Sequence, residues 1–292
     1  MIDASPISTV VLLAVLGAAL LHATWNAMVK SQTDPLVSMA WVSLASGVVA
    51  GLLLFTVAIP PAAAWPFLII STIVHTAYNL LLATAYKQGD FSRIYPIARG
   101  SAPFLVTIAS LLFLEESLSA NALIAIGLIL LAILGVAWRR ASERGPKGKA
   151  GIGDKSLIFA GLTAVAIAGY TIADGLGGRA AGDPIAYALW LFFIDAWPTI
   201  FIILWMRRGA FWQTSARGIR LSLAGGLLSM AAYSIIIWAM ASAPVAVVAA
   251  LRESSILFAA LIGIFLLKEK PGPVRIAATL MLVAAIVLLR LS

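Results

Sequence analysis

The stretch that decides the fold is YPIARGSAPFLVTIASLLFLEE, residues 95–116. It is apolar enough to lie in a lipid bilayer, yet it carries a permanent cation, Arg99, at its fifth position. The same arrangement returns downstream as VAALRESSILFAALIGIFLLKEK, residues 248–270, where Arg252 follows Arg99 by 153 residues. This pairing indicates a duplicated unit, and the cation in each copy needs a physical reason.

The composition predicts a membrane protein. The chain has 292 residues, of which 62% are hydrophobic and only 11% are charged, whereas a soluble domain has about 25% charged residues. Apolar runs of roughly twenty residues recur, which is the length a helix needs to cross a bilayer. The net charge of +8 is typical of basic cytoplasmic loops, so we expect the lipid bilayer and no nucleic acid as a partner. The absence of cysteine excludes disulfides, thiolate catalysis and cysteine metal sites.

Ten transmembrane helices are predicted, making an all-α polytopic membrane protein. The expected spans are 8–29, 36–59, 66–87, 91–114, 119–138, 156–176, 184–206, 218–241, 244–267 and 273–290. Most connections are short, and the exception is basic and rich in glycine. We therefore expect a first five-helix repeat over 1–138, a flexible cytoplasmic linker over 139–155, and a second five-helix repeat over 156–292.

Further matches support the duplication. Glu269 follows Glu116 by 153 residues, and DPLVSMAW (34–41) corresponds to DPIAYALW (183–190). Each Asp-Pro pair predicts a helix start, with a capping carboxylate followed by proline in the first turn. Because each repeat has an odd number of spans, the second copy enters the membrane from the opposite side, so we expect inverted repeats.

The basic residues predict the topology. Sixteen of the twenty Lys and Arg residues lie in loops that follow odd-numbered spans, whereas only Arg179 and Arg290 lie in the regions on the opposite side. The positive-inside rule then places the linker in the cytoplasm and both termini outside. We expect a multi-pass protein of the cell membrane, that is, of the plasma or inner membrane.

The chain resembles a known family. Ten spans, two five-span repeats and a glutamate after the fourth span of each repeat, in EES (115–117) and KEK (268–270), are similar to the EamA-type transporters of the drug/metabolite transporter superfamily. The resemblance implies movement of small metabolites, often by export, through a cavity between the repeats. It also implies that the third, fourth, eighth and ninth helices surround this cavity. We interpret Glu116 and Glu269 as capping or loop-fixing groups with little claim on substrate.

The two arginines are the first candidate substrate-binding residues. An ionisable side chain at mid-bilayer costs roughly 2.5–3.5 kcal/mol, so it normally faces protein or water. Arg99 and Arg252 each lie about eight residues into a predicted span, roughly 12 Å deep at the helical rise. We interpret them as facing each other across a substrate pathway and binding a carboxylate or phosphate-like group. The alternative is that internal carboxylates neutralise them and they only brace the helices.

Three acidic residues are candidates for proton coupling: Glu253, Asp195 and Asp174. Burial favours the neutral form of a carboxyl group, which can then carry a transported proton. Glu253 directly follows Arg252 but points about 100° away on a regular helix, so we do not expect these two to pair. A static ion pair between one of the acids and an arginine is the alternative.

Each of the two histidines begins a polar stripe at helical spacing, and such a stripe should face the protein interior. The stripes are His22, Trp25 and Asn26 in the first span and His75, Tyr78 and Asn79 in the third. Both are candidates for substrate contact, with hydrogen-bonded structural histidines as the alternative. We expect no metal site, because the sequence has no histidine pair at i, i+4.

Further aromatic residues can line a pocket for the apolar part of a ligand, with ordinary packing as the alternative. These residues are Tyr78, Tyr95, Tyr170, Tyr233 and Trp238.

The leading hypothesis is a secondary transporter for a small polar metabolite with an anionic group, with export favoured over import. It works by alternating access at a midplane cavity. No nucleotide-binding loop is present, so we expect no cofactor, with protons as an additional candidate partner. An intramembrane enzyme acting on a lipid or lipid-linked substrate is the alternative, although the sequence lacks HExxH and GxSxG. A receptor or structural protein is a third class. The sequence leaves open whether the protein is a monomer or a homodimer.

Overall fold

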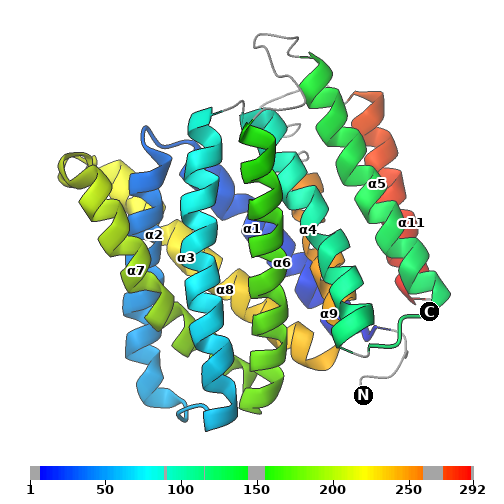
Figure 1. Cartoon of the computed structure of the whole chain (residues 1–292), viewed down its shortest axis with the longest axis horizontal. Coiled ribbons are helices and arrows are strands. Elements are labelled where there is room, and N and C mark those ends of the chain that lie inside the picture. Colours follow the sequence, from blue (N-terminus) through cyan, green and yellow to red (C-terminus); the bar gives the residue numbers. More distant parts are fainter. Residues whose placement is uncertain (1–6, 89–90, 115, 144–154, 259–271, 291–292) are drawn as a thin grey trace.

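The structure is a computed structural model that describes residues 7–88, 91–114, 116–143, 155–258 and 272–290. The described residues form ten α-helices and two short 3-10 helices, without a strand (Figure 1). The α-helices are α1 (Thr9–Lys30), α2 (Pro35–Leu53), α3 (Trp65–Gln88), α4 (Phe91–Phe113), α5 (Ala120–Glu143), α6 (Lys155–Ala181), α7 (Pro184–Trp212), α8 (Ala216–Ser242), α9 (Val245–Arg252) and α11 (Pro273–Arg290). The 3-10 helices, Leu54–Thr56 and Ala62–Ala64, lie between α2 and α3.

The helices are those of a multi-pass membrane protein. In the described part of the chain, α1, α2, α3, α6, α7 and α8 are long and apolar enough to cross a bilayer, while α4, α5 and α11 contain shorter apolar segments. Each of the ten predicted spans overlaps a helix and starts within two residues of it. Hydropathy predicted these starts because the polar residues between the helices are few and clustered.

The two Asp-Pro pairs begin helices, as predicted. Asp34 accepts hydrogen bonds from the backbone N–H groups of Leu36 and Val37, and Asp183 accepts equivalent bonds from Ile185 and Ala186. The backbone angles of the two aspartates agree, at φ −123° and ψ 99° for Asp34 and φ −119° and ψ 99° for Asp183. Both helices therefore start with the same local geometry.

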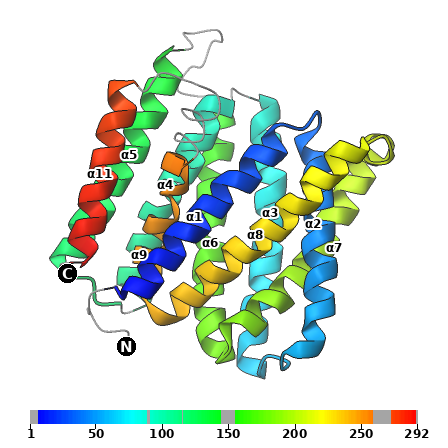
Figure 2. The same ribbon diagram turned by 180° about the vertical axis from the view of Figure 1, so that it is seen from behind.

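The helices form a two-layered bundle. Figures 1 and 2 show α3, α4 and α6 on one face and α1, α8 and α9 on the other, with α5 and α11 together at one edge and α2 and α7 at the opposite edge. The most extensive packing joins α3 to α6, α2 to α7, α1 to α8 and α5 to α11. The second half of the chain is thus interleaved with the first, and the most extensive contacts join the two halves.

Helix α9 is short and lies at the centre of the bundle. All eight of its residues are buried, and it contacts helices of both layers. The helix ends at Arg252, a turn follows at Glu253 and Ser254, and residues 255–258 are helical again. Four backbone N–H groups here bond to the carbonyl three residues back, as in a tightened 3-10 turn; they belong to Glu253, Ser254, Ile256 and Leu257. The rest of the predicted span 244–267 lies outside the described residues.

This break corrects one expectation. Arg252 and Glu253 were expected not to pair, but Arg252 Nε lies 3.5 Å from Glu253 Oε1. The expectation assumed a regular α-helix, whereas the backbone leaves the α-helical pattern between these two residues.

A buried glutamate joins the two halves of the chain. Glu116, in the connection between α4 and α5, accepts a 2.6 Å hydrogen bond from Arg179 Nη2 at the end of α6. Its two carboxylate oxygens also accept 3.0 Å bonds from the backbone N–H of Val245, the first residue of α9. Arg179 in turn donates to the carbonyl oxygens of Met240 and Ala243, where α8 ends. The interpretation of Glu116 as a capping and loop-fixing group is confirmed; Glu269 lies outside the described residues.

The first and last described helices meet at the same end of the bundle. Arg290, at the end of α11, donates a 2.7 Å hydrogen bond to the carbonyl oxygen of Ile7, just before α1. Figure 1 shows this end of the bundle opposite the end at which α5 finishes and α6 begins.

Replacing Glu116 should destabilise the protein more than removing an ordinary helix cap. Glu116→Ala leaves Arg179 without its carboxylate and Val245 without its cap, and breaking a buried ion pair costs about 3–5 kcal/mol. The matched control is Asp183→Ala, which removes an exposed capping carboxylate at a cost of about 1 kcal/mol. Thermal unfolding of both variants in detergent measures the difference, and equal losses of stability would contradict the role given to Glu116.

Candidate functional site

Four aromatic rings from three helices meet in the interior of the bundle. His75 and Tyr78 come from α3, Tyr170 from α6 and Tyr233 from α8. The His75 ring lies 4.0 Å from that of Tyr170 and 5.9 Å from that of Tyr233, measured between ring centroids. Tyr170 also makes edge contacts with Tyr78 at 5.8 Å and with Tyr233 at 6.2 Å. We call these four residues the aromatic cluster.

A fully buried carboxylate lies next to the aromatic cluster. Asp174, on α6, has no exposed surface. Its two oxygens accept hydrogen bonds from Tyr187 at 3.1 Å and from Tyr233 at 2.5 Å. The side chain of Ser71, on α3, also lies near Asp174. Hydroxyl donors from two helices, α7 and α8, therefore solvate this carboxyl group in place of water, which a polar group inside a bilayer requires.

A second carboxylate approaches the cluster from α7. Asp195 Oδ2 lies 4.0 Å from His75 Nδ1, and the same histidine nitrogen lies 3.4 Å from Ser71 Oγ. Ser71 and His75 are one helical turn apart on α3, so both side chains lie on one face. His75 thus stands between Asp195 and the serine that reaches Asp174.

Asp195 faces the protein interior. The lipid-exposed face of α7 is marked by Trp197, Phe201 and Trp205, with 37%, 67% and 87% of their surfaces exposed. Asp195 lies two residues before Trp197, about 200° around the helix. The Asp195 side chain, 24% exposed, therefore points away from Trp197 and toward His75 on α3.

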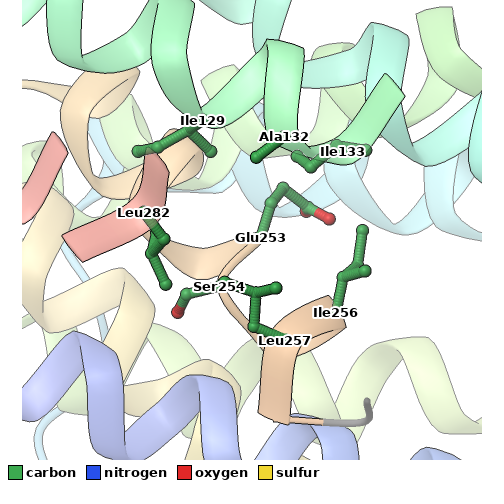
Figure 3. A pocket seen from close by; sticks show the side chains of 8 residues that line it. All are labelled: Ile129, Ala132, Ile133, Glu253, Ser254, Ile256, Leu257 and Leu282. Atoms are coloured by element: carbon green, nitrogen blue, oxygen red, sulfur yellow. The ribbon is translucent and has the colours of Figure 1, made fainter. Parts of the chain in front are cut away.

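Arg252 brings a positive charge to the same region. Its side chain is 5% exposed, and it is close enough to His75, Asp174 and Tyr233 to interact with them electrostatically. Its ion-pair partner Glu253 lies on the other side of the helix break, at a cavity between α5 and α11 (Figure 3). The centre of a water molecule can move within only about 10 Å³ of this cavity, room for about one water. That cavity is too small for a metabolite.

The structure brings together seven of the predicted site residues. They are His75, Tyr78, Tyr170, Tyr233, Asp174, Asp195 and Arg252. Asn79, one residue after Tyr78, donates a 3.2 Å hydrogen bond to Thr199 on α7. The predicted roles of these residues in binding remain predictions.

Other predicted site residues lie elsewhere. Trp25 donates a 3.3 Å hydrogen bond to His22 Nδ1, and Asn26 donates to the His22 carbonyl oxygen. Trp25 packs in a separate apolar cluster against α2 and α8, which favours the structural alternative for this stripe. Trp238 is partly buried against the main core. The side chains of Arg99 and Tyr95, on α4, lie outside the described part of the structure.

Sequence reasoning missed Tyr187, Ser71 and Thr199. Tyr187 had a recognisable signal, because both copies of the Asp-Pro motif place a hydroxyl-bearing residue four positions after the aspartate, Ser38 in one copy and Tyr187 in the other. Ser38 is also hydrogen-bonded, at 2.7 Å to Ser222. Ser71 precedes His75 by one helical turn and belonged to the same polar stripe.

The comparisons with known proteins agree on one family and one fold. The family model described as "EamA-like transporter family" matches residues 9–138 and 154–291. No curated protein matches the chain. A solved structure described only as "Crystal structure of protein" has 16% sequence identity and a TM-score of 0.79, with 97% of each chain covered. This last likeness shows the fold alone.

A glycine on α6 makes room for Tyr187 and gives a test of the Asp174 contacts. A Cβ atom at Gly177 would overlap the ring and hydroxyl of Tyr187, so Gly177→Ala should push this donor away from Asp174 and cost about 1–3 kcal/mol. The control is Gly161→Ala in the same helix, where a Cβ meets no described atom within 4 Å and alanine gains up to about 1 kcal/mol of helix propensity. Thermal unfolding compares the two variants, and equal stability would show that Tyr187 does not need this space.

Proposed function

Because the chain belongs to the EamA-like transporter family and is thus a membrane transporter, we propose that it moves a small metabolite with an anionic group by alternating access. The observation that carries this proposal is the buried arginine, Arg252, next to the polar and aromatic side chains between the helices. A buried guanidinium offers two parallel hydrogen bonds to a carboxylate or phosphate group. The neighbouring tyrosine rings offer an apolar surface for the rest of the ligand.

The proposed architecture is a pair of inverted five-helix repeats. If α1 to α5 correspond in order to α6, α7, α8, α9 and α11, the packing of α3 on α6 becomes that of α8 on α1. The pairs of α2 with α7, α4 with α9 and α5 with α11 then map onto themselves. The matched N-caps of α2 and α7 support the same correspondence. We propose repeats over 1–138 and 156–292 joined by the linker 139–155.

The proposed substrate site lies between these repeats. Arg252 binds the anionic group, and by the repeat correspondence Arg99 approaches from the opposite half. Tyr78, Tyr170 and Tyr233 form the aromatic wall. A bound oxyanion would compete with Glu253 for Arg252 and so weaken their ion pair at the break after α9. In this way, substrate binding would act on the conformation of the chain at the break. The family match gives no support to an intramembrane enzyme.

The proposed orientation places both chain ends outside and the linker in the cytoplasm, with export as the direction of transport. The chain has no cysteine, so single introduced cysteines report their side directly. Thr33→Cys, between α1 and α2, should react with a membrane-impermeant maleimide only after the cells are opened. Ala63→Cys, between α2 and α3, should react in intact cells. Both positions are exposed, and the reverse pattern would contradict the positive-inside assignment.

The anion proposal predicts a ligand preference that depends on Arg252. Phenylacetate should raise the unfolding temperature of the purified protein, whereas its neutral counterpart phenylacetamide should not. Arg252→Lys keeps the charge but loses the planar fork, and it should weaken phenylacetate binding by about 1.5–3 kcal/mol, roughly ten- to hundredfold. The control is Arg208→Ala, an exposed arginine near the end of α7, which should bind normally.

Uptake of labelled phenylacetate and glycerol phosphate into proteoliposomes tests transport itself. If phenylacetate stabilised Arg252→Lys, Arg252→Ala and the unchanged protein equally, Arg252 would not be part of the binding site.

A further inference from the structure

The structure contains a chain of ionisable and hydroxyl groups beside the proposed substrate site. It runs from Asp195 on α7 to His75 and Ser71 on α3, and on to Asp174 on α6. Exposure falls along this chain: the Asp195 side chain is 24% exposed, that of His75 is 15% exposed, and Asp174 is fully buried. The chain thus leads from the interior opening beside α7 to a carboxyl group sealed from it.

Within the described side chains, little positive charge offsets the two aspartates. Arg252 is the described cation that interacts with Asp174, but its guanidinium also faces Glu253 at 3.5 Å. An uncompensated ion within a bilayer is costly, and a proton removes this cost on a carboxylate. Each oxygen of Asp174 accepts a hydrogen bond, one from Tyr187 and one from Tyr233. Asp174 therefore keeps hydrogen-bond donors whether or not its carboxyl group carries a proton.

Other ionisable groups also face this chain. They are Tyr78 on α3, Tyr170 on α6, Tyr187 on α7, Tyr233 on α8 and, at the break after α9, Arg252 and Glu253. Helix α2, which packs on α7, has no ionisable residue between Pro35 and Leu53. In this set, the imidazole of His75 lies between the two aspartates. It can exchange a proton directly with Asp195, and with Asp174 through Ser71.

We propose that Asp195, His75, Ser71 and Asp174 form a proton pathway that couples substrate movement to a proton gradient. This inference rests on the proposed transport function. Asp195 Oδ2 and His75 Nδ1, 4.0 Å apart, need to approach by roughly 1 Å to form a hydrogen bond. The imidazole then takes the proton of Asp195 at Nδ1 and gives it to Ser71 Oγ, as the hydroxyl proton of Ser71 passes to Asp174. One proton leaves Asp195, one arrives at Asp174, and His75 and Ser71 return to their starting states.

In this pathway, movement of α7 against α3 changes the distance between Asp195 and His75 and so couples the proton transfer to the conformation. These helices belong to different halves of the chain and are in contact. Rocking of one half against the other therefore makes or breaks the link between the two carboxyl groups. A proton crosses only when the halves are in the arrangement that closes the 4.0 Å gap.

The first test needs no substrate. Infrared difference spectra of the purified, ligand-free protein between acidic and alkaline buffer should show a reversible band of protonated carboxyl groups. Asp195→Asn and Asp174→Asn should each remove a component of this band. The matched control, Asp34→Asn, changes a helix cap that asparagine replaces well, and it should keep these components. If both test variants gave the same spectrum as the unchanged protein, the inference would be overturned.

The second test separates coupling from transport. In proteoliposomes, Asp195→Asn should keep phenylacetate exchange at equal pH on both sides. This variant should lose uptake driven by a pH gradient by about tenfold or more, a usual size for a coupling free energy. Gradient-driven uptake that stays equal to that of the unchanged protein would overturn the proton pathway. Absence of any phenylacetate or glycerol phosphate movement in the unchanged protein would instead contradict the proposed function, and the infrared result would still decide the proton sites.

Discussion

The position of the central helix depends on one buried carboxylate. Glu116 holds the first backbone N–H of α9 and the guanidinium of Arg179, and Arg179 holds the last carbonyls of α8. A negative charge at a helix start is favourable because the unpaired N–H groups carry partial positive charge. Since α9 has eight residues, this anchor sets Arg252 about 10 Å further along the helix axis. The depth of Arg252 in the bundle is therefore set by Arg179 at the end of α6 and by Glu116 after α4.

The interior polar groups follow from what a bilayer permits. Every donor and acceptor in the hydrocarbon region needs a protein partner or a water-filled space, and for Asp174 these partners are the hydroxyl groups of Tyr187 and Tyr233 from two helices. The aromatic cluster beside it closes the space around these bonds with rings that tolerate both apolar and polar neighbours. Stability and the proposed binding chemistry therefore use the same side chains.

The sequence predicted local features well and contacts between helices poorly. Helix starts and the caps at Asp34 and Asp183 follow from hydropathy and from residue types at fixed offsets. The stripe at His75 was visible from helical periodicity, but its neighbour Asp195 is 120 residues away, and no periodic signal reports such a contact. The pairing of Arg252 with Glu253 was predicted wrongly because the break that permits it depends on packing around α9.

The hydrogen bond from Arg290 to the carbonyl of Ile7 has an evolutionary meaning. Segments that meet in space can be joined by a short added loop, and a chain can be reopened at an exposed connection without disturbing its packed elements. A version of this protein with the half beginning at α6 translated first would keep the pairs α1–α8, α3–α6 and α2–α7 unchanged. The contact between Arg290 and Ile7 therefore makes either order of the two halves compatible with these helix contacts.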